Sequence, residues 1–362
     1  MEILWWVIFS LNVLFASGIM LTYLGRRTGN GPSEDHTFKG DKEKALVILP
    51  IKGVDYKLEE NLRSLKDQEW QNYDIIAVVD SDKDEALPFL RREGINYMIS
   101  GEVCVDCSGK VRAILSALTK HRNYDFYVVA DSDIRVESNW LSKLLVQLHD
   151  PKIGVSTTFP LFYPEGGFWS KFKMFWGSVG QSMMESNLTK FVWGGSMAFR
   201  KDFVDERFIE QFSHSVSDDI AVLRIAKSRG LEISYVPDAR PKVHSKDDFR
   251  TFMEWSNRQT SFSIYSTRKV FVFGMIYYLV YIYLLLSSIV LAIYVNLIFI
   301  IFMFPFLFNS VNTQRKLPVK MWYFIIVTFI LPFIYSWNLI QGMLRGSVSW
   351  RGSVYLLSRN NL

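Results

Sequence analysis

Cysteine is scarce in this chain of 362 residues, which contains only Cys104 and Cys107. Their C-x-x-C spacing is found in redox couples and in halves of zinc sites. A structural zinc site needs a second pair of ligands, and a redox couple needs a thioredoxin-like context. Neither accompanies these residues. We therefore expect two reduced thiols in a cytosolic loop and assign them no function.

Ionisable side chains other than tyrosine are absent from residues 270–308. About 20 apolar residues cross a bilayer as a helix, so this stretch suffices for two spans, or for one span and a re-entrant segment. Residues 322–341 supply another span. If 270–308 forms a hairpin, the basic tail with Arg345 and Arg351 would emerge on the side opposite the cytosol, and the topology beyond the first span stays open.

Basic residues are also missing before the apolar stretch 3–24, whereas Arg26 and Arg27 follow it. This order differs from that of a cleaved signal peptide and favours a retained span with the following domain in the cytosol. We expect an integral membrane protein, in the plasma membrane of a prokaryote or in the Golgi or ER of a eukaryote. The net charge of +5 is too small to discriminate.

What is present between these apolar stretches is an alternation of strand and helix patterns. The expected strands are 46–51, 74–79, 95–99 and 126–130, and the expected helices are 58–65, 85–92 and 110–118. The alternation predicts an α/β domain with a doubly wound, mostly parallel sheet, whose ligands lie beyond the carboxyl ends of the strands. The expected domains are an anchor at 1–26, a linker at 27–44, a globular domain at 45–269 with an interfacial helix near 167–186, spans within 270–342 and a tail at 343–362.

Two acidic motifs follow apolar strands at such ends. Asp80-Ser-Asp82 comes after residues 75–79, and Asp131-Ser-Asp133 comes after residues 127–130. Each taken alone could be an ordinary acidic turn. Two such motifs in register after parallel strands favour a site in which carboxylates hold a divalent cation, which in turn holds a diphosphate.

Three further segments carry alternative interpretations. Ser217-Asp218-Asp219 begins a helical pattern. Ser217 could cap the helix, with the two acids in its first turn, or one of the carboxylates could deprotonate a hydroxyl. Residues 168–176 interleave aromatic and basic side chains, as an interfacial helix or a core-packing helix does. Gly194 and Gly195 precede a strand, where they allow close approach of the backbone to a ligand or form a plain turn.

In this order, residues 49–53, 79–86, 130–133, 194–200 and 217–219 resemble the inverting glycosyltransferases of families 2 and 21. The likeness is closest to the ceramide glucosyltransferase branch with its bacterial and archaeal relatives, and it extends over the tail at 349–355. It implies a GT-A (Rossmann-like) fold with transmembrane helices, a UDP-sugar donor, Mg²⁺ or Mn²⁺, and a membrane lipid acceptor. No nucleic acid polymer is expected as a partner.

The resemblance also implies roles for individual residues. The implied nucleotide-sugar-binding residues are Pro50, Lys52, Asp80, Asp82, Lys110, Asp131, Ser132 and Asp133, and the implied metal ligands are Asp131, Asp133 and His244. The implied acceptor-binding residues are Trp193, Gly194, Gly195 and Ser196, and the implied catalytic residues are Asp219 as base, with Asp218, Trp255 and Arg258. Lys110 could equally be a solvated lysine, His244 a satisfied surface histidine, and Arg258 an interfacial arginine beside the next span.

One departure from the family pattern concerns the (Gln/Arg)-x-x-Arg-Trp motif. Here Glu254 precedes Trp255, and Thr251 holds the first position. The following Arg258 could supply the missing cation. We predict a membrane enzyme that transfers a hexose from a UDP-sugar to a lipid hydroxyl with inversion. The alternatives are a processive polysaccharide synthase and a non-catalytic membrane subunit that binds nucleotide or lipid.

Overall fold

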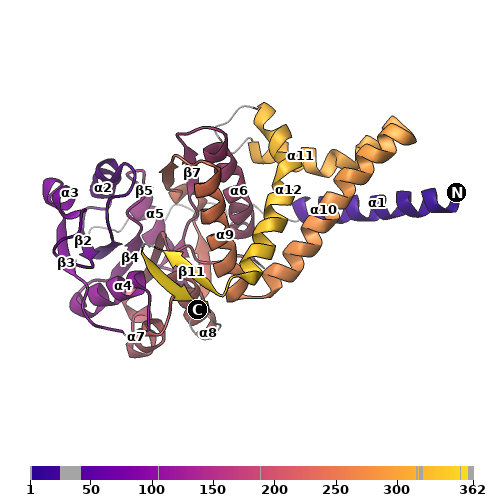
Figure 1. Ribbon diagram of the computed structural model, residues 1–362. Helices are drawn as coiled ribbons and strands as arrows, with labels where there is room; N and C mark the ends of the chain where they lie inside the picture. Colours follow the sequence, from indigo (N-terminus) through magenta and orange to yellow (C-terminus); the bar gives the residue numbers. More distant parts are fainter. Residues whose placement is uncertain are drawn as a thin grey trace. The chain divides into compact units, whose positions relative to one another are not determined.

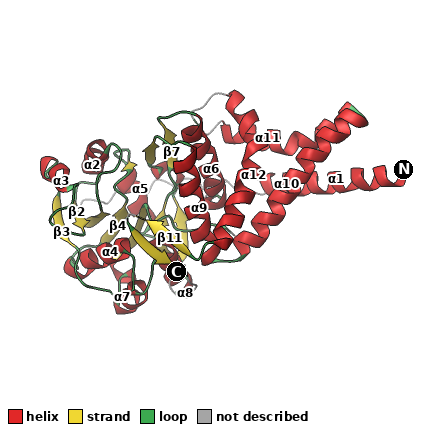
Figure 2. Cartoon of the chain, in the orientation of Figure 1, coloured by secondary structure: helices red, strands yellow, loops and turns green. Residues whose placement is uncertain are grey.

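The structure is a computed structural model that describes residues 2–24, 42–104, 106–187, 189–314, 317, 321–350 and 352–357. The chain forms two compact units, each made of two stretches of sequence (Figure 1). The helical unit comprises Met1–Arg27 and Asp248–Gly346, and the sheet unit comprises Thr28–Asp247 and Ser347–Leu362. All described strands belong to the sheet unit (Figure 2).

A seven-stranded sheet with the order β3-β2-β1-β4-β8-β6-β9 forms the centre of the sheet unit. Its strands are β1 (Ala45–Pro50), β2 (Tyr73–Val79), β3 (Asn96–Ile99), β4 (Phe126–Ala130), β6 (Ile153–Thr157), β8 (Ser196–Arg200) and β9 (Glu232–Tyr235). All neighbours are parallel except β8, which is antiparallel to both β4 and β6. The predicted α/β fold with a mostly parallel sheet is confirmed.

Helices pack on the sheet, which explains why its strands consist of apolar residues. Leu46 and Ile48 of β1 share a core with helices α4 (Gly109–Lys120), α7 (Glu206–Ser213) and α8 (Asp218–Ser228). Because side chains alternate along a strand, Val47 and Leu49 face the other side, where they are also fully buried. Burial on both faces accounts for strands that read as continuous apolar runs. The other described helices of the sheet unit before residue 150 are α2 (Leu58–Lys66), α3 (Leu87–Arg92) and α5 (Trp140–Gln147).

A second, three-stranded sheet has the order β5-β10-β7 and was not expected from the sequence. Its strands are β5 (Ile134–Arg135), β7 (Leu161–Pro164) and β10 (Lys242–Ser245), and β10 runs parallel to β7 but antiparallel to β5. In the antiparallel pair, Val243 lies opposite Ile134. Because β5 begins directly after Asp133, the sheet brings β10 to the acidic motif that follows β4.

Helix α6 (Phe168–Met184) contains the aromatic and basic segment. Phe172 and Phe175 are buried, and Lys173 forms a buried ion pair with Asp247 at 3.0 Å. For Lys173, the structure therefore supports the core-packing interpretation of this segment over the interfacial one. Its aliphatic stem leads inward to a carboxylate, as in a core-packing helix.

The helical unit contains α1 (Glu2–Leu24), α9 (Phe249–Ser266), α10 (Lys269–Tyr294), the 3-10 helix η3 (Leu297–Met303), α11 (Phe304–Gln314) and α12 (Met321–Leu344). Among the described residues, three helices are long and apolar enough to cross a membrane, over Trp5–Leu24, Lys269–Tyr294 and Val327–Leu344. Residues 270–308 thus hold one such helix followed by shorter apolar helices, and the number of spans in this stretch stays a prediction. Tyr23 of α1 hydrogen-bonds to Tyr277 of α10 at 2.7 Å.

The tail returns to the sheet unit as a hairpin of β11 (Ser347–Trp350) and β12 (Ser353–Leu356). Val348 is buried, and the hydroxyl of Tyr355 accepts a hydrogen bond from the backbone N–H of Gly109 at 3.5 Å. The tail therefore packs within the sheet unit, and the side of a membrane on which it lies stays a prediction. The chain leaves the sheet unit after Asp247 and comes back to it at Ser347.

Candidate active site

Asp80 is held between two cations at the carboxyl end of β2. Its Oδ2 lies 3.0 Å from Lys52 Nζ, and its Oδ1 lies 3.4 Å from Arg112 Nη2. Lys52 follows Pro50, the last residue of β1, and Arg112 comes from α4, so three elements meet at this carboxylate. Asp82, two residues further along, is exposed. The group can receive a polar ligand such as a nucleoside, because its side chains are partly open to solvent.

Lys110 joins two of the acidic motifs. Its Nζ lies 2.7 Å from Asp131 Oδ1, after β4, and 3.1 Å from Asp218 Oδ2, at the start of α8. Only 10% of the Lys110 side chain is exposed. The alternative of a solvated lysine is therefore wrong, and two carboxylates separated by 87 residues in sequence (218 minus 131) share one ammonium group.

Burial and the ion pairs together shift the pKa values of Lys110 and Asp218. Burial lowers the pKa of Lys110, but the carboxylates of Asp131, Asp218 and Asp219 raise it further, so the net pKa lies above its usual range. Burial raises the pKa of Asp218 to about 6, although Lys110 opposes the change. The lysine therefore stays charged at neutral pH, and Asp218 exchanges its proton close to neutrality.

The Asp131-Ser132-Asp133 segment is fixed by hydrogen bonds to its backbone and to its central side chain. The N–H of Asp131 donates to the carbonyl of Gly195 at 3.0 Å, and Asn61 Nδ2 donates to the carbonyl of Ser132 at 3.1 Å. The buried Ser132 hydroxyl donates to the carboxylate of Asp55. Ser132 thus holds the turn from inside, with an aspartate on either side of it.

Gly194 allows the carboxylate of Asp218 to lie against the backbone before β8. A Cβ added at Gly194 would lie 2.3 Å from Asp218 Oδ2, closer than any side chain tolerates. The neighbouring Ser196 is fully buried, and its hydroxyl accepts a hydrogen bond from Trp140 Nε1 at 2.9 Å. The indole of Trp193 remains partly exposed at the same turn. The backbone at Gly194 thus lies close to the carboxylate of Asp218, a side chain of the protein itself.

We expect Gly194→Ala to lower the turnover rate at this site about 100-fold, because the methyl group displaces Asp218 and with it the shared lysine. Steady-state turnover of the purified protein measures the effect. Gly101→Ala is the matched control, since its Cβ would meet only ordinary contacts at 3.8 and 3.9 Å. Equal rates in the two variants would contradict the prediction.

Asp219 stands at the start of α8 beside Asp218 but has different partners. Its Oδ1 accepts hydrogen bonds from the Ser217 hydroxyl and from the N–H of Ile220, the latter at 2.8 Å. Ser217 occupies the N-cap position, yet its side chain makes no capping bond to the described backbone. The hydroxyl orients the carboxylate instead, and Asp219 is only partly buried.

His244 lies on β10, one residue beyond the pair formed by Val243 and Ile134. Extending that antiparallel register by one residue sets His244 opposite Asp133. The imidazole is buried, so the interpretation as a surface histidine is wrong. Its Nδ1 bonds to Glu165, while no hydrogen-bond partner of Nε2 occurs among the described residues. An imidazole with one free, buried nitrogen is suited to bind a metal ion.

Trp255 and Arg258 lie on α9 of the helical unit, three residues apart and therefore on one helix face. Asn257 between them is buried and accepts a hydrogen bond from Asn338 Nδ2 of α12 at 2.8 Å. Its amide is thus engaged within the helical unit. The catalytic roles expected for Trp255 and Arg258 stay predictions.

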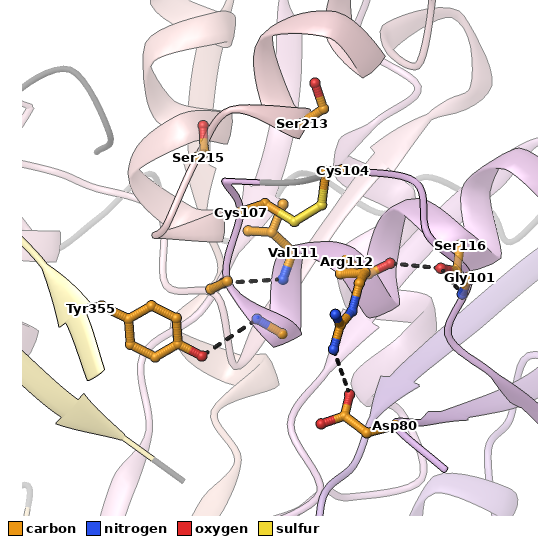
Figure 3. The surroundings of a disulfide bond; sticks show 12 residues. Asp80, Gly101, Cys104, Cys107, Val111, Arg112, Ser116, Ser213, Ser215 and Tyr355 are labelled. Atoms are coloured by element: carbon orange, nitrogen blue, oxygen red, sulfur yellow. Dashed lines mark hydrogen bonds and ion pairs between the residues drawn. A yellow bond between two sulfur atoms is a disulfide. The ribbon is translucent and has the colours of Figure 1, made fainter. Parts of the chain in front are cut away.

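Cys104 and Cys107 form a disulfide, so the expectation of two free thiols is wrong (Figure 3). The loop before α4 turns back on itself and brings the two Cα atoms to 5.9 Å, within the range of a disulfide. The bridge comes directly before Ser108, which caps α4 by accepting from the N–H of Val111 at 3.2 Å. It therefore closes the loop that leads to Lys110 and Arg112.

Sequence reasoning missed Arg112 and Glu165. Arg112 lies two residues after Lys110, but nothing local distinguishes it from a solvated arginine on a helix. Glu165 follows β7, and its link to His244 depends on the small sheet. A weak signal for Glu165 was the strand-like run before it, which ends in a carboxylate as the two acidic motifs do.

Comparison with known proteins places these features in a family. The sequence profile described as "Glycosyl transferase family 21" matches residues 10–362. Ceramide glucosyltransferase 3 of Caenorhabditis elegans is 25% identical over 224 residues, 59% of this chain and 48% of the relative, so the match spans about half the relative's length.

Two solved structures are similar to this chain to different degrees. A mannosyltransferase from Pyrobaculum calidifontis has a TM-score of 0.55 at 14% identity, over 93% of this chain and 95% of that chain. Glucosyl-3-phosphoglycerate synthase from Mycobacterium tuberculosis has a TM-score of 0.41 at 13% identity, over 62% and 80% of the two chains. The first likeness identifies the fold as that of GT-A-like glycosyltransferases, and the profile match extends over nearly the whole sequence. The chain belongs to glycosyl transferase family 21.

Proposed function

We propose that this glycosyltransferase moves a hexose from a UDP-sugar to the hydroxyl of a membrane lipid, with inversion and with a divalent cation. The observation that carries the proposal is the ion-pair cluster around Lys110. It joins Asp131, at the end of β4, to Asp218, directly before Asp219. A donor-binding motif and a candidate base are thereby held at one place in the sheet unit.

The donor's nucleoside would lie at Asp80, where Lys52 and Arg112 fix the carboxylate. An aspartate fixed by two cations can accept hydrogen bonds from a uracil or a ribose without changing its position. Arg112 and Lys110 come from the first turn of the same helix. The helix N-terminus and its cations favour a negative ligand, so the diphosphate would lie between the Asp80 group and Asp131.

The divalent cation would be held by Asp131, Asp133 and His244. No group of three potential ligands is gathered within the described ranges, and Lys110 engages Asp131. The donor chemistry nevertheless fits, because His244 offers a buried Nε2 and its strand register faces Asp133. When bound, such an ion would neutralise charge on the departing diphosphate.

Asp219 is the proposed base, and Asp218 is not. Asp218 is enclosed by Lys110 and the backbone of Gly194, whereas Asp219 is partly open and oriented by Ser217. Asp219 would take the proton of the acceptor hydroxyl, whose oxygen forms a bond to the anomeric carbon. The bond from that carbon to the diphosphate oxygen breaks at the same time, on the opposite face, so the configuration inverts.

The apolar helices and the relative support the proposed class of acceptor. Three helices of the helical unit are long and apolar enough to cross a membrane, and the C. elegans relative is named a ceramide glucosyltransferase. These findings support a lipid hydroxyl as the acceptor. Trp193 beside Gly194 and Gly195, and Trp255 with Arg258 on α9, are proposed to contact the acceptor or the leaving group.

Release of UDP by the detergent-purified full chain tests the proposal. The donors are UDP-glucose, UDP-galactose, UDP-N-acetylglucosamine and GDP-mannose, each with a membrane lipid extract and with Mn²⁺ or EDTA. We expect release with one UDP-sugar that requires lipid and Mn²⁺. Mass spectrometry of the product should show one hexose per lipid, and NMR a β-linkage from an α-linked donor.

The other outcomes would overturn parts of the proposal. Release of GDP would refute the uridine donor, and activity unchanged by EDTA would refute the cation. A ladder of products would indicate a processive synthase. Bound UDP without turnover of any donor would indicate a non-catalytic nucleotide-binding subunit.

A further inference from the structure

Glu165 gathers three hydrogen-bond donors at the edge of the small sheet. Its Oε1 accepts from Lys57 Nζ and lies 2.5 Å from Nδ1 of His244, and its Oε2 accepts from the Tyr56 hydroxyl at 2.9 Å. The Lys57 and Glu165 side chains are 26% and 19% exposed. A carboxylate that already accepts from an ammonium group is ionised, so the proton between Glu165 and His244 stays on Nδ1.

That proton fixes the state of the other ring nitrogen. A neutral imidazole protonated at Nδ1 carries a lone pair at Nε2, which is the form that binds metal ions. Nε2 is buried and makes no hydrogen bond to any described residue. Carboxylates that accept from the second nitrogen of a metal-binding histidine orient the ring and raise its basicity.

The backbone holds Glu165 and His244 in one register. β7 and β10 run parallel with His244 opposite Tyr163, and the N–H of Glu165 donates to the carbonyl of Ser245 at 3.0 Å. The rings of Tyr163 and His244 lie 4.9 Å apart, which restricts rotation of the imidazole. Both the position and the orientation of the ring are therefore set before any ligand arrives.

Lys57, which forms an ion pair with Glu165, adopts a left-handed backbone conformation that residues other than glycine rarely take. Its φ of 57° is the only positive φ at a non-glycine position in the described chain. Such a residue persists where its surroundings hold it, and it is common next to functional sites. Here the ion pair to Glu165 holds the side chain, and the carbonyl of Lys57 accepts from the N–H of Asn61 at 3.1 Å.

We propose that Glu165, held by Tyr56 and Lys57, is a positioning residue that orients His244 and fixes its tautomer for binding a divalent cation. This inference rests on the proposed function, because it takes His244 as a cation ligand. Glu165 itself does not touch the cation or the substrate. Its effect is on the affinity for the ion, and a merely structural residue would leave that affinity unchanged.

Mn²⁺ titration of the full-length protein with UDP present, followed by the EPR signal of free Mn²⁺, tests the proposal without turnover. We expect Glu165→Leu to weaken Mn²⁺ binding about 10–100-fold. Glu165→Gln should weaken it less, because the amide oxygen still accepts from Nδ1. The matched control is Glu137→Leu, since Glu137 pairs with Lys242 on the same strand but does not contact His244. Melting temperatures verify folding.

The outcomes separate this inference from the proposed function. Wild-type affinity in both Glu165 variants, together with loss of binding in His244→Ala, would overturn the role of Glu165 and leave the cation site standing. Wild-type affinity in His244→Ala would remove the histidine as a ligand and the inference with it. Absence of Mn²⁺ binding by the wild type would overturn the cation itself. If Glu165→Leu unfolds, Glu165→Gln alone decides: weakened Mn²⁺ binding supports the role of Glu165, and wild-type affinity overturns it.

Discussion

Asp219→Asn is expected to lower kcat about 1,000-fold while the KM for the donor changes less than about twofold. An asparagine cannot take the proton of the acceptor hydroxyl. It can still accept hydrogen bonds at its amide oxygen, from the Ser217 hydroxyl and the N–H of Ile220, as Asp219 Oδ1 does. The substitution therefore removes the base and preserves the start of α8. Steady-state UDP release, measured at several donor concentrations, separates kcat from KM.

A surface carboxylate provides the control for this prediction. Asp238 is exposed on the 3-10 helix η2 (Pro237–Ala239), and Asp238→Asn should leave both parameters unchanged. A kcat of Asp219→Asn within tenfold of the wild type would exclude Asp219 as the base. Asp218 would then be the next carboxylate to replace, because its pKa of about 6 permits proton exchange near neutral pH.

Lys110→Met is expected to destabilise the protein by about 3–5 kcal/mol, because it leaves the buried carboxylate of Asp218 and the partly exposed carboxylate of Asp131 without their shared cation. For a unit of this size, each 1 kcal/mol lowers the melting temperature by about 2–4 °C. Thermal unfolding in detergent, followed with EDTA present, should therefore show a drop of about 6–20 °C. Added Mn²⁺ should recover part of the loss, since a cation at Asp131 replaces the missing positive charge.

The exposed pair of Lys44 and Asp74 provides the comparison. Their side chains are 44% and 48% exposed, so Lys44→Met should cost at most about 1 kcal/mol. If Lys110→Met unfolds at the wild-type temperature, the cluster adds nothing to stability. The charges of Asp131 and Asp218 would then have to be accommodated in another way, by protonation or by hydration.

The parallel half of the sheet could be predicted because its strands are buried on both faces. Val47 and Leu49 alternate with Leu46 and Ile48 and are all apolar, which marks a central strand between two helical layers. The antiparallel β8 could not be predicted, since nothing in five residues specifies direction. The four-residue strands β7 and β10 carry too little periodicity to be distinguished from loops.

The acidic motifs could be located from sequence because they follow recognisable strands. Their connection through Lys110 could not, because ion pairs between α4, β4 and α8 depend on how the helices close over the sheet. The same holds for His244 and Glu165, which are 79 residues apart in sequence. Lys110 is not a solvated lysine and His244 is not a surface histidine, because both side chains are buried, and burial becomes known only from the folded chain. The disulfide likewise depends on the bend of a loop that spacing alone does not specify.

The hairpin β11–β12 has a consequence for how the protein is made. After the first 27 residues, which belong to the helical unit, the ribosome synthesises residues 28–247, then about 100 further residues of the helical unit, and only then the hairpin of the sheet unit. Until that time the N–H of Gly109 lacks its hydrogen bond to Tyr355, and the surface that buries Val348 is uncovered. Final assembly of the sheet unit is thus delayed until the apolar helices have been synthesised. A shortened version that stops at Asp247, designed to be handled without detergent, would lack this last piece.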